Sequence, residues 1–395
     1  MIDTQFCVAH RRWRVYALKI FWLVPIICIA TSNWSCAAQP SSVPEVVQLS
    51  VEEQDAAASF GKLVARLSGP GGYFDTDNLI SNESSYLHVI PRLKTLGLEG
   101  GVYLGVGPDQ NFSYIAHLKP SFAIILDIRR DNMLTHLLYK ALFELSDDRV
   151  AFLGNLFARY PEIAKRKETA LDVDSLMGLI EDTALLELPE REALVDVVHQ
   201  KVLQFGIDLS VEDLAMIKQI HQEFIQSGPS LRFSSHGRSP QSYYPTYREL
   251  ATEKTLEGDY ASFLSTEAHF QVLKSMHEAN LIVPVVGNFA GEHPLPEIAS
   301  YLKEQDLQVS AFYTSNVEFY LMYQQEISQF AANVAQLPLK DGSIFIRSYF
   351  NRWRAGHPLS VPGYGSTQLL QPISKMLAMQ NPSYQQLILD DVLDY

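Results

Sequence analysis

The sequence predicts an α/β fold in which helices cover both faces of a doubly wound, mostly parallel sheet of the Rossmann-like kind. Residues 101–116 contain an apolar run, a Gly-x-Gly turn and a helical pattern, which form half of a nucleotide-binding βαβ unit. A second apolar run, residues 122–127, ends in the carboxylate of Asp127. Short apolar strands alternate with helical patterns again over residues 266–313, and this alternation is typical of a parallel sheet.

The loop after the first predicted strand has the chemistry of a nucleotide site. Gly105 and Gly107 lack side chains, so the backbone can approach a ligand closely, and the following helix offers unpaired N–H groups at its N-terminus. Asp127 lies 20 residues beyond Gly107, where dinucleotide-binding folds place an acid that binds ribose. Gln110 occupies the position of the third glycine of that fingerprint, and Pro108 stiffens the loop. A plain NAD site is therefore disfavoured.

The same loop resembles that of class I S-adenosylmethionine-dependent methyltransferases, in which two close glycines pass the amino-acid end of the cofactor and an acid after the second strand holds its ribose. The chain also resembles a family of bacterial proteins that have a methyltransferase-like core and no established activity. This resemblance rests on residues 81–88 (SNESSYLH), 104–112 (LGVGPDQNF), 127–132 (DIRRDN), 281–291 (LIVPVVGNFAG) and 311–320 (AFYTSNVEFY). It implies a sheet of methyltransferase type, S-adenosylmethionine as the cofactor, and cofactor contacts from Glu83, Gly105, Gly107, Asp109, Asn111 and Asp127.

Polar side chains follow two of the later predicted strands. Asn288 follows the strand over residues 281–286, and Ser315, Asn316 and Glu318 follow the strand over residues 309–313. Ligands of parallel sheets bind outside the carboxyl ends of the strands, so these four residues are the candidates for binding the acceptor or for catalysis. The alternative is that Ser315 or Asn316 caps the helix that follows.

Residues 75–83 form a polar lead-in to the first strand. They are rich in Asp, Asn and Ser, which favour turns and caps. We expect this lead-in to lie over the pocket with Asn82 and Glu83 touching the ligand. The alternative is that it caps a helix over residues 85–96.

Composition limits the classes of partner. The chain has 395 residues with 47% hydrophobic residues, which is enough for a large core with an insertion. Its 45 acidic residues outnumber 31 basic ones, giving a net charge of −14, so a nucleic-acid partner is disfavoured and a small-molecule ligand is expected. All three cysteines lie in the first 36 residues, so the predicted domain has no thiolate zinc site and no cysteine nucleophile, and the sequence predicts no metal.

Residues 1–38 have the parts of a secretory signal peptide. A basic region that includes Arg11 and Arg12 precedes a short apolar run, and small residues follow. The run is shorter than the roughly 20 residues of a membrane span, so export with cleavage is favoured over an uncleaved anchor. Cys36 as a lipidation site and Arg11-Arg12 as a twin-arginine signal are alternatives. We therefore expect an extracytoplasmic protein, periplasmic or membrane-anchored, with membrane contact through this segment only; a cytoplasmic location is the alternative.

The rest of the chain divides by pattern. The region from Ala151 to Ser227 lacks strand patterns and is predicted to be a helical insertion. Residues 228–247 combine turn formers with tyrosines, which favours a lid with His236 as its candidate base, against a solvated loop histidine. The predicted parts are a signal peptide or N-terminal anchor (1–38), a linker and helix (39–74), the first half of the core (75–160), a helical insertion (161–228), a loop or lid (229–262), the second half of the core (263–350) and a C-terminal tail (351–395).

These expectations lead to three functional hypotheses. The first is an S-adenosylmethionine-dependent methyltransferase with an unknown acceptor, in which positioning of the acceptor supplies most of the catalysis. The second is an exported non-catalytic ligand-binding or envelope protein that keeps the fold and its pocket. The third and weakest is a nucleotide-dependent oxidoreductase. A fold of this kind hosts many functions, so the site has to distinguish them.

Overall fold

The computed structural model describes residues 48–395, with gaps at 77–78, 162–170, 236–240, 352–355 and 380–381. Its centre is a six-stranded sheet in the order β3-β2-β1-β4-β5-β6. Strands β1 to β5 run parallel, and β6 pairs with β5 in the antiparallel direction. The strands are β1 (Val102–Gly105), β2 (Phe122–Asp127), β3 (Ile282–Val286), β4 (Val309–Ser315), β5 (Leu339–Phe350) and β6 (Ser366–Pro372). The predicted α/β class with a mostly parallel sheet is confirmed.

The central strands are short apolar runs because helices cover both of their faces. Every residue of β1, β2 and β3 is buried, as expected for parallel strands enclosed on two sides. From β1 the chain moves outward to β2 and β3, and then returns to β4 on the other side of β1. The topological switch point therefore lies between β1 and β4, where α/β sheets open a crevice for ligands.

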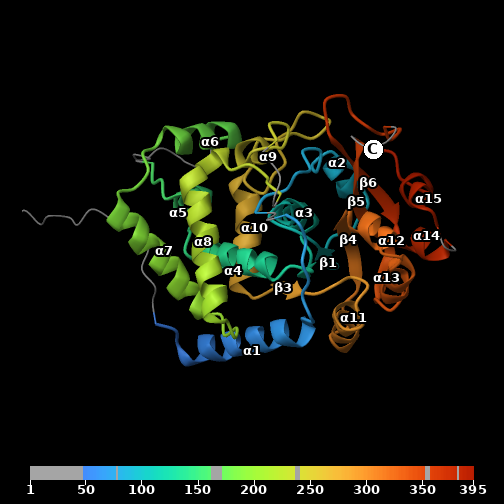
Figure 1. Cartoon of the computed structure of the whole chain (residues 1–395), viewed down its shortest axis with the longest axis horizontal. Helices are drawn as coiled ribbons and strands as arrows, with labels where there is room; N and C mark the ends of the chain where they lie inside the picture. The colour runs from blue at the N-terminus through green and yellow to red at the C-terminus, as the bar shows by residue number, and fades with distance from the viewer. Residues whose placement is uncertain (1–47, 77–78, 162–170, 236–240, 352–355, 380–381) are drawn as a thin grey trace, which may run out of the picture. The chain divides into compact units, whose positions relative to one another are not determined.

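Two groups of helices enclose the sheet (Figure 1). On one side lie α3 (Gln110–Leu118), α4 (Arg130–Glu144) and α10 (Glu267–Glu278), where α10 contacts both α3 and α4 and α4 contacts β2 and β3. On the other side lie α11 (Pro294–Glu304), α12 (Val317–Tyr323), α13 (Ile327–Val334) and α14 (Ile373–Ala378). The predicted crossover helices at residues 266–279 and 296–305 correspond to α10 and α11.

The helix before the core, α1 (Val51–Leu67), has the bounds that the sequence predicts. The Ser50 hydroxyl accepts from the Glu53 N–H, and the Glu53 carboxylate accepts from the Ser50 N–H, which forms a capping box. Apolar spacing predicts that Val51, Ala58, Leu63 and Leu67 form the buried stripe. Of these only Leu67 is buried, together with Phe60 and Val64, while Val51 is exposed. This face packs on β3 and α11.

The described elements between α4 and residue 227 are all helices. They are α5 (Arg149–Phe157), α6 (Val173–Asp182), α7 (Leu188–Leu203) and α8 (Val211–Ser227). The residues Ser210-Val-Glu-Asp213 resemble a capping box in the sequence, and Ser210 and Asp213 form this box at the start of α8. Helix α8 packs against α4, α5 and α7, so these helices extend the layer that covers one face of the sheet.

The C-terminal region differs from the predicted tail. Residues 351–395 contain β6, α14 and α15 (Tyr384–Leu389), and the strand expected over residues 343–347 extends from Leu339 to Phe350 and is not the last. Apolar patterns in the sequence do not predict β6, because glutamines occupy positions where a buried strand usually has apolar residues. Gln368 and Gln371 are fully buried, and their amides bind polar groups inside the protein.

Two further segments differ from their predictions. The expected helix over residues 85–96 is reduced to α2 (Ile90–Thr95), because Glu83 and Ser85 bind partners on the sheet instead of capping a helix. Regular structure flanks residues 228–247: a 3-10 helix (Gly228–Ser230) begins the segment, and α9 (Tyr247–Ala251) follows it. Bridges join Arg232 to Thr246 and Ser235 to Thr76. His236 lies outside the described residues.

Candidate functional site

A large cavity opens at the carboxyl ends of the parallel strands. Its volume is about 1120 Å³, slightly above the roughly 300–1,000 Å³ that holds a drug-sized ligand. The loop after β1 and the residues after β4 both line it, so it lies at the switch point of the sheet. Three further segments complete the walls of the cavity: residues 73–76 and 81–84 before β1, residues between 233 and 244 before α9, and residues from the end of β5 onward. Seven residues that the sequence analysis singled out line this cavity: Asn82, Glu83, Gly107, Asp127, Asn288, Ser315 and Asn316.

The glycine loop after β1 is held from inside by Asn111. The Asn111 side-chain amide donates to the carbonyls of Val106, Gly107 and Pro108 at 2.9, 3.2 and 2.7 Å, and its oxygen accepts from the Tyr103 hydroxyl at 2.8 Å. Asn111 is fully buried and does not line the cavity. The structure therefore gives it a role in shaping the loop, in place of the cofactor contact that the resemblance implies.

Glycine is needed at positions 105 and 107 of the loop for different physical reasons. Gly107 has φ +79°, a left-handed conformation that favours glycine, and it lines the cavity. Gly105 does not line the cavity, and a Cβ there would stand 2.0 Å from the Asn111 side-chain oxygen. Gly105 therefore makes room for Asn111, and only Gly107 fits the expected close approach to a ligand.

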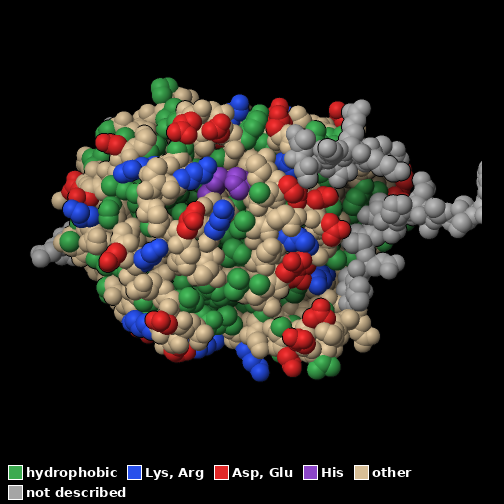
Figure 2. Space-filling view, turned by 180° about the vertical axis from the view of Figure 1, so that it is seen from behind, with side chains coloured by type: hydrophobic (Ala, Val, Ile, Leu, Met, Phe, Trp, Pro, Cys, Tyr) green, Lys and Arg blue, Asp and Glu red, His purple; other side chains and the backbone are tan. Residues whose placement is uncertain are grey.

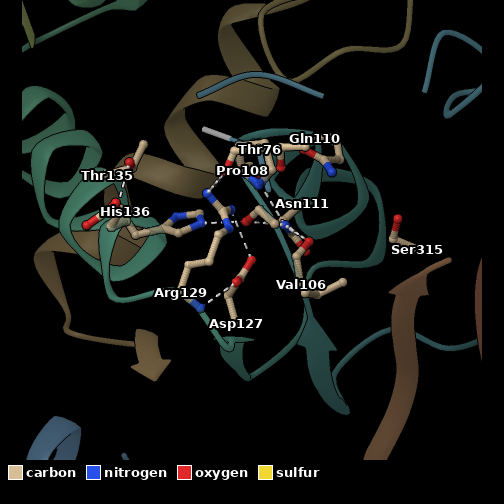
Figure 3. A network of polar contacts seen from close by, with 12 residues as sticks. Thr76, Val106, Pro108, Gln110, Asn111, Asp127, Arg129, Thr135, His136 and Ser315 are labelled. Atoms are coloured by element: carbon tan, nitrogen blue, oxygen red, sulfur yellow. Dashed lines mark hydrogen bonds and ion pairs between the residues drawn. The ribbon is translucent and has the colours of Figure 1, made fainter. Parts of the chain in front are cut away.

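Asp127 lies at the end of β2 with Arg129 folded back onto it (Figure 3). One carboxylate oxygen accepts from the Arg129 backbone N–H at 2.8 Å, and the other pairs with the Arg129 guanidinium at 3.2 Å. Both side chains are buried and both line the cavity. A carboxylate has about four acceptor positions. Asp127 can therefore accept from ligand hydroxyls as well as from Arg129.

His136 on α4 fixes the glycine loop from the other side. Its Nε2–H donates to the Gly107 carbonyl at 2.8 Å, and its ring is almost fully buried, not half-buried on the surface as its position on the predicted helix suggests. Burial lowers the pKa of His136 to about 4, so the ring is neutral near neutral pH. His136 therefore supports the loop as a neutral donor.

Glu83 forms the floor of the cavity between the lead-in and the sheet. Its carboxylate accepts from the Tyr313 hydroxyl at 2.7 Å and from the Gln368 amide at 2.9 Å, and it also accepts from the hydroxyls of Ser315 and Ser348. These donors come from β4, β5 and β6. The buried carboxylate thus joins three strands through neutral donors.

Ser315, the last residue of β4, and Asn316 directly after it both line the cavity. Ser315 has φ +53°, an uncommon conformation for a residue other than glycine, and such strain clusters at functional sites. Neither residue makes a side-chain cap for α12, so the capping alternative does not describe them. Asn288, after β3, lines the cavity too, and its amide donates to Glu326 at 3.1 Å.

Glu318 lies away from the cavity, in contrast to its predicted place among the catalytic candidates. It is buried on α12, pairs with Arg347 of β5 at 2.8 Å and accepts from the Thr314 hydroxyl at 2.9 Å. Arg347 in turn donates to Gln371 at 2.5 Å. The ion pair holds α12 on the sheet, which the spacing of Glu318 after the strand did not reveal.

Asp109 lines a second, much smaller cavity of about 10 Å³, roughly the space of one water molecule. Ser81 and Gln110 line both cavities, so the two are neighbours. Burial raises the pKa of Asp109 to about 7. The structure places Asp109 behind the glycine loop and not in the large cavity, where the resemblance implies a cofactor contact.

Aromatic side chains form much of the remaining wall. The segment before α9 contributes Phe233 and Tyr244, whose rings are 4.7 Å apart, and Tyr243 beside them. Arg129 and the aromatic residues from α12, β5 and α15 were missed by the sequence analysis. Arg129 could have been predicted, because it lies two residues after Asp127. The aromatic residues come from distant parts of the chain, so the sequence gives no indication that they meet at one cavity.

One protein family matches the chain over most of its length. The family described as a domain of unknown function, DUF7790, matches residues 78–169 and 211–391, which is more than half of the chain. This chain belongs to the DUF7790 family. The match leaves out residues 170–210, which contain α6 and α7.

The DUF7790 match includes the glycine loop, Asp127, the cavity residues after β3 and β4, and β6. No curated protein matches the sequence. The family description assigns no activity, so the resemblance to methyltransferases stays a prediction.

Proposed function

We propose that this protein is an S-adenosylmethionine-dependent methyltransferase of the methyltransferase-type α/β fold, acting on a small molecule. The observation that carries the proposal is the meeting of Gly107, Asp127 and Ser315 around one cavity at the switch point of the sheet. At Gly107 a ligand can approach the backbone of the loop closely, and at the end of β2 Asp127 offers a carboxylate. A nucleoside needs both features, the first for close contact with the loop and the second to bind the ribose hydroxyls.

The residues present fit such a cofactor. Gly107 presents no side chain to the cavity, and Asp127 accepts hydrogen bonds from ribose hydroxyls while Arg129 fixes its orientation. S-adenosylmethionine bound there would supply an electrophilic methyl group. Transfer of this methyl group to an acceptor lone pair would leave the carbon–sulfur bonding electrons on sulfur, and an O–H or N–H acceptor would release its proton to solvent. Ser315 and Asn316 position the acceptor, so most of the rate enhancement comes from proximity and orientation.

The test is calorimetric titration of the full chain with S-adenosylmethionine and S-adenosylhomocysteine. Binding is expected with both, and Asp127→Asn should weaken it roughly 10- to 100-fold, because a hydrogen bond to a charged group contributes about 1.5–3 kcal/mol. Asp131→Asn is the matched control, since Asp131 is an exposed acid at the start of α4 that does not line the cavity. Absence of binding by the folded wild-type protein at concentrations that detect micromolar affinity would overturn the proposal.

One observation favours a second function, that of an exported ligand-binding protein without catalysis. Two carboxyl groups of the cavity are engaged with partners of the protein itself: Asp127 with Arg129, and Glu83 with four neutral donors. Such a pocket recognises a ligand without a group poised for proton transfer. Release of S-adenosylhomocysteine during incubation with S-adenosylmethionine and cell extract supports the methyltransferase, while ligand binding without any turnover supports the binding protein.

A further inference from the structure

The wall of the cavity beyond β4 is made of aromatic rings in consecutive contact. Phe74 meets Tyr320 with ring centroids 4.9 Å apart, Tyr320 meets Phe319 at 5.4 Å, and Phe319 meets Tyr384 at 5.4 Å. Tyr384 continues to Tyr349 at 6.4 Å. All five rings line the cavity, and we call them the aromatic wall. The spacings lie within the roughly 4.5–7 Å that aromatic pairs prefer.

The aromatic wall comes from four separate parts of the chain. Phe74 precedes the core, Phe319 and Tyr320 lie on α12, Tyr349 lies on β5, and Tyr384 begins α15. Helix α12 is fixed on the sheet by the buried ion pair of Glu318 with Arg347, so the wall has a rigid support. Convergence of rings from four segments on one cavity builds a surface for a ligand.

Charge divides the cavity into two halves. Asp127 and Arg129 lie at the carboxyl end of β2, whereas the described lining residues from Ser315 onward include no Asp, Glu, Lys or Arg. Glu83 is the acidic lining residue that reaches β4, β5 and β6, and its carboxylate accepts from four neutral donors there. A ligand group with a carboxylate or phosphate therefore finds no described cation on the aromatic half. The aromatic half suits an uncharged group.

The size of the cavity leaves room for this second group. Its volume of about 1120 Å³ exceeds the range of roughly 300–1,000 Å³ for sites that hold a single drug-sized ligand. A nucleoside cofactor at Gly107 and Asp127 occupies the polar half. The aromatic half then remains open for the acceptor. Ser315 and Asn316 directly precede α12, which carries two rings of the aromatic wall.

We propose that the aromatic wall binds a planar, uncharged aromatic molecule, and that this is the acceptor class of the enzyme; the assignment as acceptor rests on the proposed function. Faces and edges of aromatic rings attract one another beyond the effect of buried area, by about 0.5–1.5 kcal/mol for each pair. A saturated molecule of the same size loses this contribution. The wall therefore distinguishes aromatic from saturated ligands.

Calorimetry of the full chain with 2-naphthol, decahydro-2-naphthol and 2-naphthoate tests the proposal. We expect 2-naphthol to bind about tenfold more tightly than the saturated alcohol, which corresponds to about 1.4 kcal/mol, and more tightly than the anion. Tyr320→Leu and Tyr384→Leu should each remove most of this preference. Tyr301→Leu is the matched control, because Tyr301 is a partly buried ring on α11 outside the cavity. Urea unfolding of each variant identifies any that fails to fold.

The outcomes separate this inference from the proposed function. Equal affinity for the aromatic and saturated alcohols, or tighter binding of 2-naphthoate, overturns the inference even if S-adenosylhomocysteine binds. Selective binding of 2-naphthol without any binding of S-adenosylhomocysteine upholds the aromatic site and removes the methyltransferase. If both bind, 2-naphthol should still bind when S-adenosylhomocysteine is saturating, and displacement of one by the other contradicts two separate halves.

Discussion

Asn111 holds the glycine loop by donating through one amide to three backbone carbonyls. Asn111→Ala leaves these buried carbonyls and the Tyr103 hydroxyl without that partner, and each unsatisfied buried group costs about 1–3 kcal/mol. We expect a loss of about 3 kcal/mol in the free energy of unfolding, measured with urea, and weaker ligand binding. Gln305→Ala, an exposed amide at the end of α11, is the control. An unchanged midpoint for Asn111→Ala would mean that the loop does not depend on this side chain.

Glu318 tests whether a polar residue after a strand is structural or catalytic. Glu318→Gln leaves the buried Arg347 without its counter-charge, and breaking a buried pair costs about 3–5 kcal/mol. We expect a large drop in the urea midpoint with unchanged ligand affinity for the protein that remains folded. The exposed pair of Arg66 with Glu304 offers the comparison, since Glu304→Gln should move the midpoint little. Loss of ligand binding at unchanged stability would restore Glu318 to the catalytic candidates.

Asp109 makes stability depend on pH. Burial raises the pKa of Asp109 to about 7 in the folded protein from 3.8 for an ordinary aspartate, so the folded state binds more protons than the unfolded state between these pH values. The contribution of Asp109 is complete below about pH 4 and is lost as the pH rises to about 7. The difference in unfolding free energy between the wild type and Asp109→Asn should fall over this range, by up to roughly 4 kcal/mol, and level off above it. A difference that is flat from pH 4 to 8 would contradict the shift.

At the residue scale, the sequence predicts cavity residues best where the backbone alone decides their position. Asp127 and Ser315 are the last residues of β2 and β4, Gly107 and Asn288 lie two residues after β1 and β3, and the strands themselves could be identified. Glu318 lies three residues after Ser315, on α12. At this position the direction of the Glu318 side chain decides whether the carboxylate faces the cavity or the core. That direction depends on Arg347, a partner 29 residues away that spacing does not reveal.

Helix α7 shows why elements with one apolar stripe are predictable while their partners are not. Leu194, Val198 and Val202 are buried as the helical spacing predicts, and the helix packs on α4 and α8. Leu194→Ala should reduce the unfolding free energy by about 2–5 kcal/mol, because it creates a cavity in this contact. Leu188→Ala on the same helix should stay within about 0.5 kcal/mol, since Leu188 is 56% exposed. Equal effects of the two substitutions would mean that α7, which lies outside the DUF7790 match, adds no packing to the domain.

Strand β6 represents the opposite case at the element scale. Its sequence, STQLLQP, has no apolar alternation, yet its residues from Ser366 to Gln371 are buried. Gln368 donates to Glu83 and Gln371 accepts from Arg347, so the polar residues of β6 replace an apolar pattern by hydrogen bonds to distant charges. A strand stabilised by tertiary polar contacts leaves no local signal.

At the scale of the whole molecule, the described residues and the N-terminal segment carry different kinds of information. The α/β core contains the cavity at the switch point of the sheet, and the face shown in Figure 2 has acidic and basic side chains interspersed. No helix among the described residues is long and apolar enough to cross a membrane. The predicted signal segment and Cys36 lie outside the described residues, so the location of the protein rests on the sequence of residues 1–38.

Export and methyl transfer make opposite demands, because S-adenosylmethionine is a cytoplasmic cofactor. A cleaved signal peptide or an anchor with Arg11, Arg12 and Arg14 inside both put the domain beyond the membrane. A fusion of residues 1–60 to alkaline phosphatase, which is active only after export, should therefore be active, while a fusion of residues 39–60 alone should be silent. Activity of the longer fusion favours the ligand-binding protein, since an exported pocket needs another ligand than the cofactor. A well-expressed but silent longer fusion overturns the export prediction, keeps the domain with its cofactor and favours the enzyme.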